Sequence, residues 1–88
     1  PKKTVDYEDL IKRCFLTSKR EKHLLAVGMQ IDIYCKKFIG KPDIDNTAKV
    51  VMDSLNGLAY NDDSQVIKLE VEKFISNEEK LIIRTYDI

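Results

Sequence analysis

The sequence predicts an α+β domain, a two-layer α/β sandwich in which helices pack on one small mixed sheet. Two observations lead to this prediction. Apolar residues recur with helical spacing in residues 4–18 and again in about 45–56, whereas residues 25–36 alternate with the period of a strand. Two further strand-like runs follow at 65–75 and 80–86. The expected order is therefore helix, strand, helix, strand, strand.

The first helix and the first strand each show a clear period. In the helix, apolar side chains fall at i, i+3, i+4, i+7 and i+8, namely Tyr7, Leu10, Ile11, Cys14 and Phe15. In the strand, apolar residues fall at every second position, namely Val27, Met29, Ile31, Ile33 and Cys35, which predicts a half-buried strand. Cys14 and Cys35 occupy apolar positions of these patterns, so we expect both to be buried free thiols.

The second helix is expected from about Asp45 to Asn56. Pro42 disfavours helical geometry in the residue before it, and Asn56-Gly57 is a common helix stop. The stripe that should face the sheet consists of Ala48, Val51, Met52 and Leu55. The two last strands are separated by the turn-like residues 76–79, so we expect them to pair with each other as a hairpin.

Length and composition indicate one domain over residues 1–88, with 43% apolar residues. A core of this size favours association with a second copy, for which the strand at 25–36 or the first helix would provide the surface. No apolar run approaches the roughly 20 residues that cross a membrane, and no signal peptide is visible. We therefore expect a soluble, cytoplasmic protein that does not enter a membrane.

Charge is divided between the two halves of the chain. Residues 1–41 carry ten basic and five acidic side chains, whereas residues 42–88 carry five basic and ten acidic ones. Such a division is compatible with a polyanion held by the first half and a cation held by the second. The basic residues that could line a path for phosphates are Lys2, Lys3, Lys12, Arg13, Lys19, Arg20, Lys22, Lys36, Lys37 and Lys41.

Two acidic clusters indicate the candidate site. Asp43 and Asp45 precede the second helix, and Asp62 and Asp63 lie in the next loop. If residues 43–45 are extended, both carboxylates point the same way, and such hard oxygen ligands favour Mg²⁺ or Mn²⁺. Taken separately, the first cluster also fits helix capping and the second fits a turn. Brought together, with Lys49 between them, the carboxylates would repel one another without a cation.

These residues carry a resemblance to a known family. The run K-P-D-x-D-N-x-x-K-x-x-x-D-x-L-N-G at 41–57, followed by A-Y-x-D-D-S-Q-V at 59–66, resembles the signature of the RusA family of Holliday junction resolvases, which are phage and prophage endodeoxyribonucleases. The opening PKKTVDYEDLIK is similar to the first helix of that family. The strand and basic loop that normally precede this helix are not found in residues 1–88.

The resemblance implies a function and the residues that perform it. Asp43, Asp45 and Asp63 match the catalytic, magnesium-binding carboxylates, Lys49 matches the catalytic lysine, and Asp62 lies in the same motif as a further candidate ligand. The expected protein is a Mg²⁺-dependent endonuclease, a homodimer whose two sites nick four-way DNA junctions symmetrically in recombination and repair. In such an enzyme the ion would activate water and polarise the phosphate, and lysine would stabilise the transition state.

Two other functions stay open at this point. The chain could be a catalytically silent DNA-binding or structural remnant of the same fold, or a small magnesium-binding protein without a nucleic-acid substrate. Of the remaining residues, we expect Tyr60 to be a packing residue and His23 to be ordinary surface without a partner for acid–base chemistry.

Overall fold

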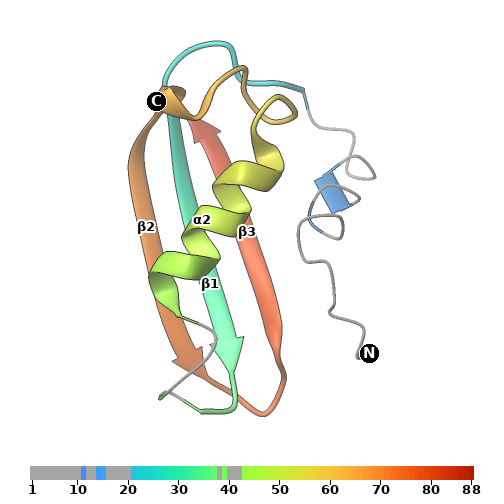
Figure 1. The fold of residues 1–88 in the computed structure, drawn as a ribbon, viewed down its shortest axis with the longest axis vertical. Coiled ribbons are helices and arrows are strands. Elements are labelled where there is room, and N and C mark those ends of the chain that lie inside the picture. The colour runs from blue at the N-terminus through green and yellow to red at the C-terminus, as the bar shows by residue number, and fades with distance from the viewer. Residues whose placement is uncertain (1–10, 12–13, 16–20, 38, 40–42) are drawn as a thin grey trace.

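The computed structural model describes residues 11, 14–15, 21–37, 39 and 43–88. Its elements, drawn in Figure 1, are β1 (Val27–Cys35), α2 (Ile44–Leu55), the short 3₁₀ helix η1 (Asp63–Gln65), β2 (Val66–Ile75) and β3 (Lys80–Asp87). The three strands form one mixed sheet, and α2 lies across one of its faces (Figure 1). This confirms the α+β class and the mixed sheet. No helix among the described residues is both long and apolar enough to cross a membrane.

The sheet has the order β2-β1-β3, with β1 parallel to β2 and antiparallel to β3. A parallel pair needs a crossover connection, and α2 is that connection between β1 and β2. The prediction that β2 and β3 form a hairpin is therefore wrong, because β1 lies between them.

A four-residue link is long enough for this arrangement. Two strands on either side of a third are about 10 Å apart, and four residues of extended chain reach about 13 Å. The link is attached to the end of β1, since the Ser76 amide donates to the Cys35 carbonyl at 2.8 Å. Burying the most apolar strand on both edges stabilises this order over a local hairpin.

The strand β1 is buried on both faces, although its alternating pattern predicted a half-buried strand. Val27, Met29 and Ile31 are fully buried in the core on one face. On the other face Gly28 is covered by the ring of Tyr86, and Asp32 is buried because it has charged and polar partners there.

The second helix forms within one residue of its predicted limits. The stripe of Ala48, Val51 and Leu55 is buried against the sheet, and Met52 packs at its margin. The chain turns away after the helix at Gly57, whose φ of 87° is readily adopted only by a residue without a β-carbon.

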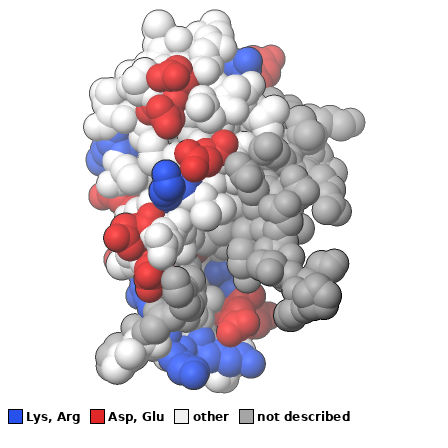
Figure 2. Space-filling model, in the orientation of Figure 1, with Lys and Arg blue, Asp and Glu red and all other residues white. Residues whose placement is uncertain are grey.

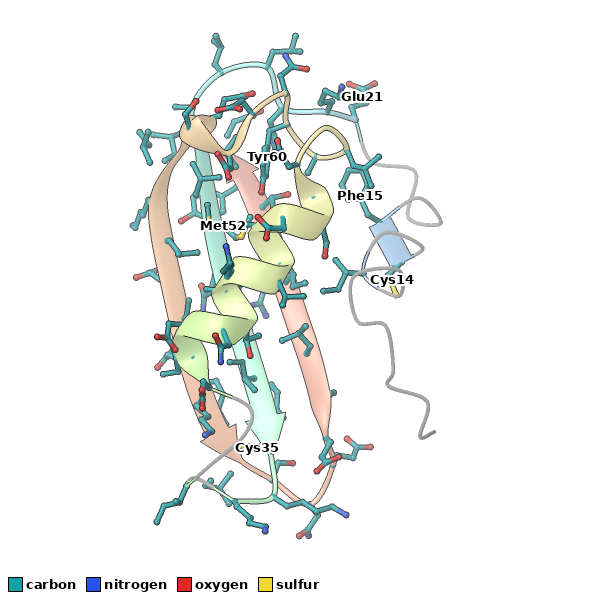
Figure 3. All side chains as sticks on the ribbon, in the orientation of Figure 1. Cys14, Phe15, Glu21, Cys35, Met52 and Tyr60 are labelled. Carbon is teal, nitrogen blue, oxygen red and sulfur yellow. The ribbon has the colours of Figure 1, made fainter. Side chains whose placement is uncertain are left out.

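The predicted first helix falls largely outside the described residues. Positions 11, 14 and 15 are helical; Ile11 belongs to the core and Phe15 packs against it. The predicted order of elements, which begins with a complete helix at residues 4–18, therefore stays a prediction. Cys35 is buried as expected, whereas Cys14, labelled in Figure 3, is exposed, so the prediction of a buried thiol is wrong for Cys14.

Candidate active site

Asp43 occupies the N-cap position of α2 without using its side chain as a cap. Its backbone is extended, with φ −86° and ψ 149°, and its carbonyl accepts from the Thr47 amide at 3.0 Å. Its carboxylate makes no capping bond to the helix; instead Oδ2 accepts from the side-chain amide of Asn46 at 3.0 Å. The capping interpretation therefore does not account for the Asp43 carboxylate.

Asp45 lies in the first turn of α2 and is exposed. Its Oδ1 accepts a 3.0 Å bond from the Asn46 backbone amide, so Asn46 contacts both aspartates. Two carboxylates at the positive end of the helix dipole are favourably placed. Asn46 joins them into one polar group at the start of α2.

Lys49 and Asp53 continue this polar surface one and two turns further along. The Lys49 Nζ lies 3.9 Å from Asp53 Oδ2, and the side chains are 76% and 51% exposed. Exposed ion pairs of this kind contribute little to stability and exchange readily with solvent. Figure 2 shows acidic side chains following this face of the molecule with a basic one among them.

The second acidic cluster forms a capped turn. Asp62 accepts from the Ser64 amide at 2.9 Å, and Gln65 Oε1 accepts from the amides of Asn61 and Asp62 at 2.7 and 3.0 Å. This is a capping box, and the hydrogen bonds from Ser64 hold the pKa of Asp62 below its usual value. The turn interpretation thus describes Asp62, which had been expected also as a metal ligand.

Gln65 is a structural residue that the sequence reasoning missed. Its amide nitrogen donates to the carbonyls of His23 and Leu25 at 3.1 and 2.8 Å, which fastens the acidic turn to the segment before β1. The spacing Asp62-x-x-Gln65 matches a capping box and could have indicated that Gln65 helps to cap the turn. The contact with residues 23–25 depends on the sheet order and has no local signal.

Tyr60 is a packing residue, as predicted. It is fully buried, and its hydroxyl donates to the Met52 carbonyl at 3.0 Å (Figure 3). Burial raises the pKa of Tyr60 to about 12, with smaller contributions from the negative charges of Asp63 and Asp53.

The structure does not bring the two acidic clusters together within one chain. Asp43 and Asp45 lie where α2 begins, whereas η1, with Asp63, lies beyond its other end at the start of β2 (Figure 1). Among the described residues, which include all the candidate carboxylates, no three acidic, histidine or cysteine side chains are grouped to hold a metal ion. The expectation that Asp43, Asp45 and Asp63 share an ion in one chain is thus not met.

The parallel crossover explains this separation. Asp43 follows the C-terminal end of β1, and Asp63 precedes the N-terminal end of β2, which runs in the same direction. The two positions are consequently at opposite ends of the sheet, separated by a 12-residue helix of about 18 Å.

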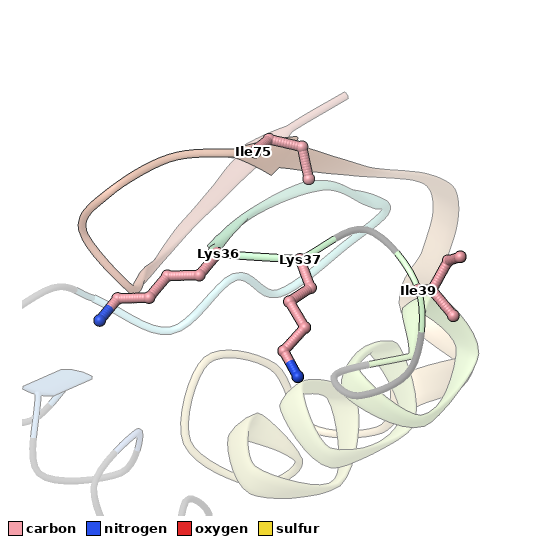
Figure 4. A pocket seen from close by; sticks show the side chains of 4 residues that line it. All are labelled: Lys36, Lys37, Ile39 and Ile75. Atoms are coloured by element: carbon pink, nitrogen blue, oxygen red, sulfur yellow. The ribbon is translucent and has the colours of Figure 1, made fainter.

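A basic, partly apolar surface lies at the end of β1. Lys36 and Lys37 are exposed there, and with Ile39 and Ile75 they line an open pocket of about 300 Å³ (Figure 4). Of the predicted phosphate-binding residues, Lys22 is also described and exposed. The others lie outside the described residues: Lys2, Lys3, Lys12, Arg13, Lys19, Arg20 and Lys41.

His23 has partners, contrary to the prediction. Its Nδ1 lies 2.6 Å from Asp87 Oδ1 and its Nε2 lies 3.0 Å from Thr85 Oγ1, with the side chain only 15% exposed. The antiparallel pairing of β1 with β3 brings the end of β3 beside the start of β1, which explains the contact. His23 therefore fastens the segment before β1 to β3.

The geometry defines an α+β domain with two carboxylates, Asp43 and Asp45, at the entry of one helix. The family is shown by comparison: a family model described as "Endodeoxyribonuclease RusA" matches residues 1–86, and the chain belongs to this family. It is also 48% identical over 48 residues to "Uncharacterized protein YqaN" of Bacillus subtilis (strain 168). That match covers 54% of this chain and 34% of the relative, so the chain spans about a third of the relative's length.

Proposed function

We propose that this chain is the nuclease domain of a homodimeric, Mg²⁺-dependent endodeoxyribonuclease that resolves four-way DNA junctions by paired, symmetric nicks. The observation that carries this proposal is the family match over residues 1–86. A second observation supports it at the site: the Asp43 carboxylate stands at the entry of α2 without serving as its cap.

The residues of one chain fit a magnesium site only in part. Asp43 and Asp45 supply oxygen ligands of the type that Mg²⁺ prefers, and when bound the ion would activate water and polarise a phosphoryl oxygen. A third carboxylate is not grouped with them among the described residues. One chain thus supplies two of the three proposed carboxylates. Asp63 is proposed as the third ligand, which would reach the ion after a rearrangement or from a second copy.

Lys49 is proposed to act on the phosphate directly. Its Nζ lies 3.9 Å from Asp53 Oδ2 in a solvent-exposed ion pair, and this weak contact is easily exchanged for a phosphate oxygen. A lysine placed one turn beyond Asp45 would stabilise negative charge that develops on the phosphate during cleavage.

Binding of DNA must overcome the repulsion of the acidic face of α2. Lys36 and Lys37 are suited to this because they are exposed at the end of β1, just before the chain turns toward Asp43. Nonspecific affinity for DNA depends largely on such contacts with phosphates and weakens as salt rises. We propose that this basic end of the sheet holds the backbone beside the scissile phosphate.

The test uses a labelled four-way junction and a linear duplex of the same arms, each with Mg²⁺ and with EDTA. The full-length protein should nick the junction at symmetric positions with Mg²⁺, leave the duplex largely intact and be inactive in EDTA. Equal cutting of both substrates would contradict the proposed preference for junctions, and unchanged cutting in EDTA would contradict the metal requirement.

One observation favours a second candidate, a catalytically silent DNA-binding protein of the same fold. It is the lack of a group of three metal-binding side chains among the described residues. Such a protein would bind the junction and change its affinity with Mg²⁺, yet produce no nicks. The same assay separates the two functions, provided that binding is measured in parallel by gel shift.

A further inference from the structure

The strand β2 is an open edge of the sheet with unusual composition. It is ten residues long, and among the described residues it pairs with β1 on one side only. Ile67, Leu69 and Ile75 are 64%, 40% and 58% exposed, although Leu69 is in register with the core residue Met29. An exposed apolar edge strand without proline is a ready template for pairing with another strand.

The charged residues of β2 show which strand would fit. Lys68, Glu70 and Glu72 are exposed at alternate positions, on the sheet face away from Met29 and α2. When two copies pair antiparallel around a two-fold axis perpendicular to the sheet, paired residues share a face, so their numbers add to an even total. The possible registers can therefore be compared directly.

One register is favoured by both charge and shape. With Leu69 opposite its own copy, Lys68 pairs with Glu70 twice and Ile67 pairs with Val71 twice. Shifting the centre to position 70 places Glu70 against Glu70, and shifting it to 71 places Glu70 against Glu72, which is unfavourable. The register centred on position 70 also pairs Lys68 with Glu72 twice and Leu69 with Val71 twice, but it keeps the Glu70–Glu70 contact at the axis. Only the register centred on Leu69 combines two opposite-charge pairs and an apolar cluster without a like-charge pair.

The other edge, β3, has no equivalent. Its basic residues Lys80 and Arg84 lie at even positions and its acidic residue Asp87 at an odd position, so opposite charges fall on different faces. The two surfaces expected from the sequence are less suitable as well. Both edges of β1 are already paired, so the strand at 25–36 cannot provide the interface by edge pairing. Ile11 and Phe15 of the first helix pack against the core of their own chain.

We propose that two copies of this chain pair antiparallel along β2, over residues 67–71 with Leu69 at the two-fold axis, to form one continuous six-stranded sheet. This interface rests on the homodimer of the proposed function and specifies where it forms. Both α2 helices then lie on the same face of the sheet. The register also brings the start of β2 in each copy beside the end of β2 in the other copy, at the end of the sheet from which α2 starts.

A cysteine at the axis tests the register. In the full-length protein carrying Cys14→Ser to remove the exposed thiol, Leu69→Cys should form a covalent dimer on mild oxidation, because directly opposed β-carbons are within disulfide reach. The matched control is Ile67→Cys, whose copies would be four positions out of register and should remain uncrosslinked. Equal crosslinking of both variants, or none of Leu69→Cys, would overturn the register.

Charge reversal tests the interface without a new bond. Lys68→Glu and Glu70→Lys should each weaken the dimer about tenfold in sedimentation equilibrium, because each creates two like-charge pairs. The double variant should restore the affinity of the original protein. If the dissociation constant of the dimer were the same in all three variants as in the original protein, the β2 interface would be overturned. The homodimer and its junction cleavage would stay in place. A monomer that cleaves junctions would overturn the interface and the homodimer but not the nuclease activity.

Discussion

Asp43 and Asp62 both belong to the family signature, but their carboxylates have different roles. Asp62 caps a turn, whereas Asp43 does not cap its helix. We predict that Asp43→Asn abolishes junction cleavage and leaves junction binding intact or slightly stronger, because a ligand charge is lost and repulsion of DNA falls. Cleavage and gel-shift assays on one preparation measure both effects.

Asp62→Asn is the matched control, since it removes one charge of the same type from a side chain with a structural role. Asp62→Asn should lower the midpoint temperature of thermal unfolding and retain more cleavage activity than Asp43→Asn. The midpoint temperature of Asp43→Asn should hardly change. If Asp43→Asn lost binding, activity and stability together, Asp43 would be a structural residue rather than a catalytic one.

Tyr60 gives a pH-dependent prediction. Its folded pKa of about 12 lies above the ordinary value of 10.0, so the folded state retains the proton more tightly than the unfolded state. That contribution to stability is complete below pH 10 and is lost as the pH rises toward 12. Tyr60→Phe should remove this dependence and, by loss of the bond to Met52, cost about 1 kcal/mol at pH 7. Urea unfolding at several pH values tests it, and an unchanged alkaline slope in Tyr60→Phe would contradict it.

At the level of elements, β1 and β3 are joined by a buried charge as well as by backbone pairing. Asp32 is 5% exposed; its Oδ2 accepts from Arg84 at 3.0 Å and its Oδ1 from Gln30 at 3.1 Å. We predict that Arg84→Met destabilises the domain by about 1–3 kcal/mol, because a buried carboxylate loses its countercharge. Denaturant unfolding measures the change.

The double variant Asp32→Asn with Arg84→Met separates charge from packing. It should recover part of the lost stability, since no unpaired charge is then buried. A double variant less stable than Arg84→Met alone would contradict this account, because the unpaired charge of Asp32 would then not be the source of the loss.

The elements themselves could be predicted from local pattern, whereas their arrangement could not. The period of 3.6 located α2, and the period of 2 located β1, because each depends only on residues within the element. The partner of β3 depends on competition between a local hairpin and the burial of β1, and a link of four residues permits both. The contacts of His23 and the burial of Asp32 follow from that choice, so they had no signal in the sequence.

At the scale of the whole molecule, the same limit applies to the candidate site. The spacing of Asp43, Asp45 and Lys49 was sufficient to place them at the entry and on the outer face of α2, which the structure confirms. The position of Asp63 depends on whether β2 runs parallel or antiparallel to β1. The parallel direction carries Asp63 to the far end of the helix, and a second copy paired antiparallel along β2 would bring its own start of β2 beside the end of β2 in the first copy.

The last prediction concerns how two copies share the work of resolution. Cutting a junction into two duplexes requires two nicks related by symmetry, and a two-fold dimer supplies that relation. Active and Asp43→Asn subunits are mixed until they exchange, and the mixture is incubated with a cruciform plasmid. Each mixed dimer then holds one intact Asp43, and it should produce circles with a single nick instead of linear DNA. The ratio of nicked to linear product should rise with the fraction of the variant, while the unmixed active protein gives mainly linear product. The contrary result is a linear product that falls only in proportion to the fraction of active subunit, with no increase in nicked circles. It would show that each copy cuts both strands by itself, and the dimer would then contribute stability rather than symmetry.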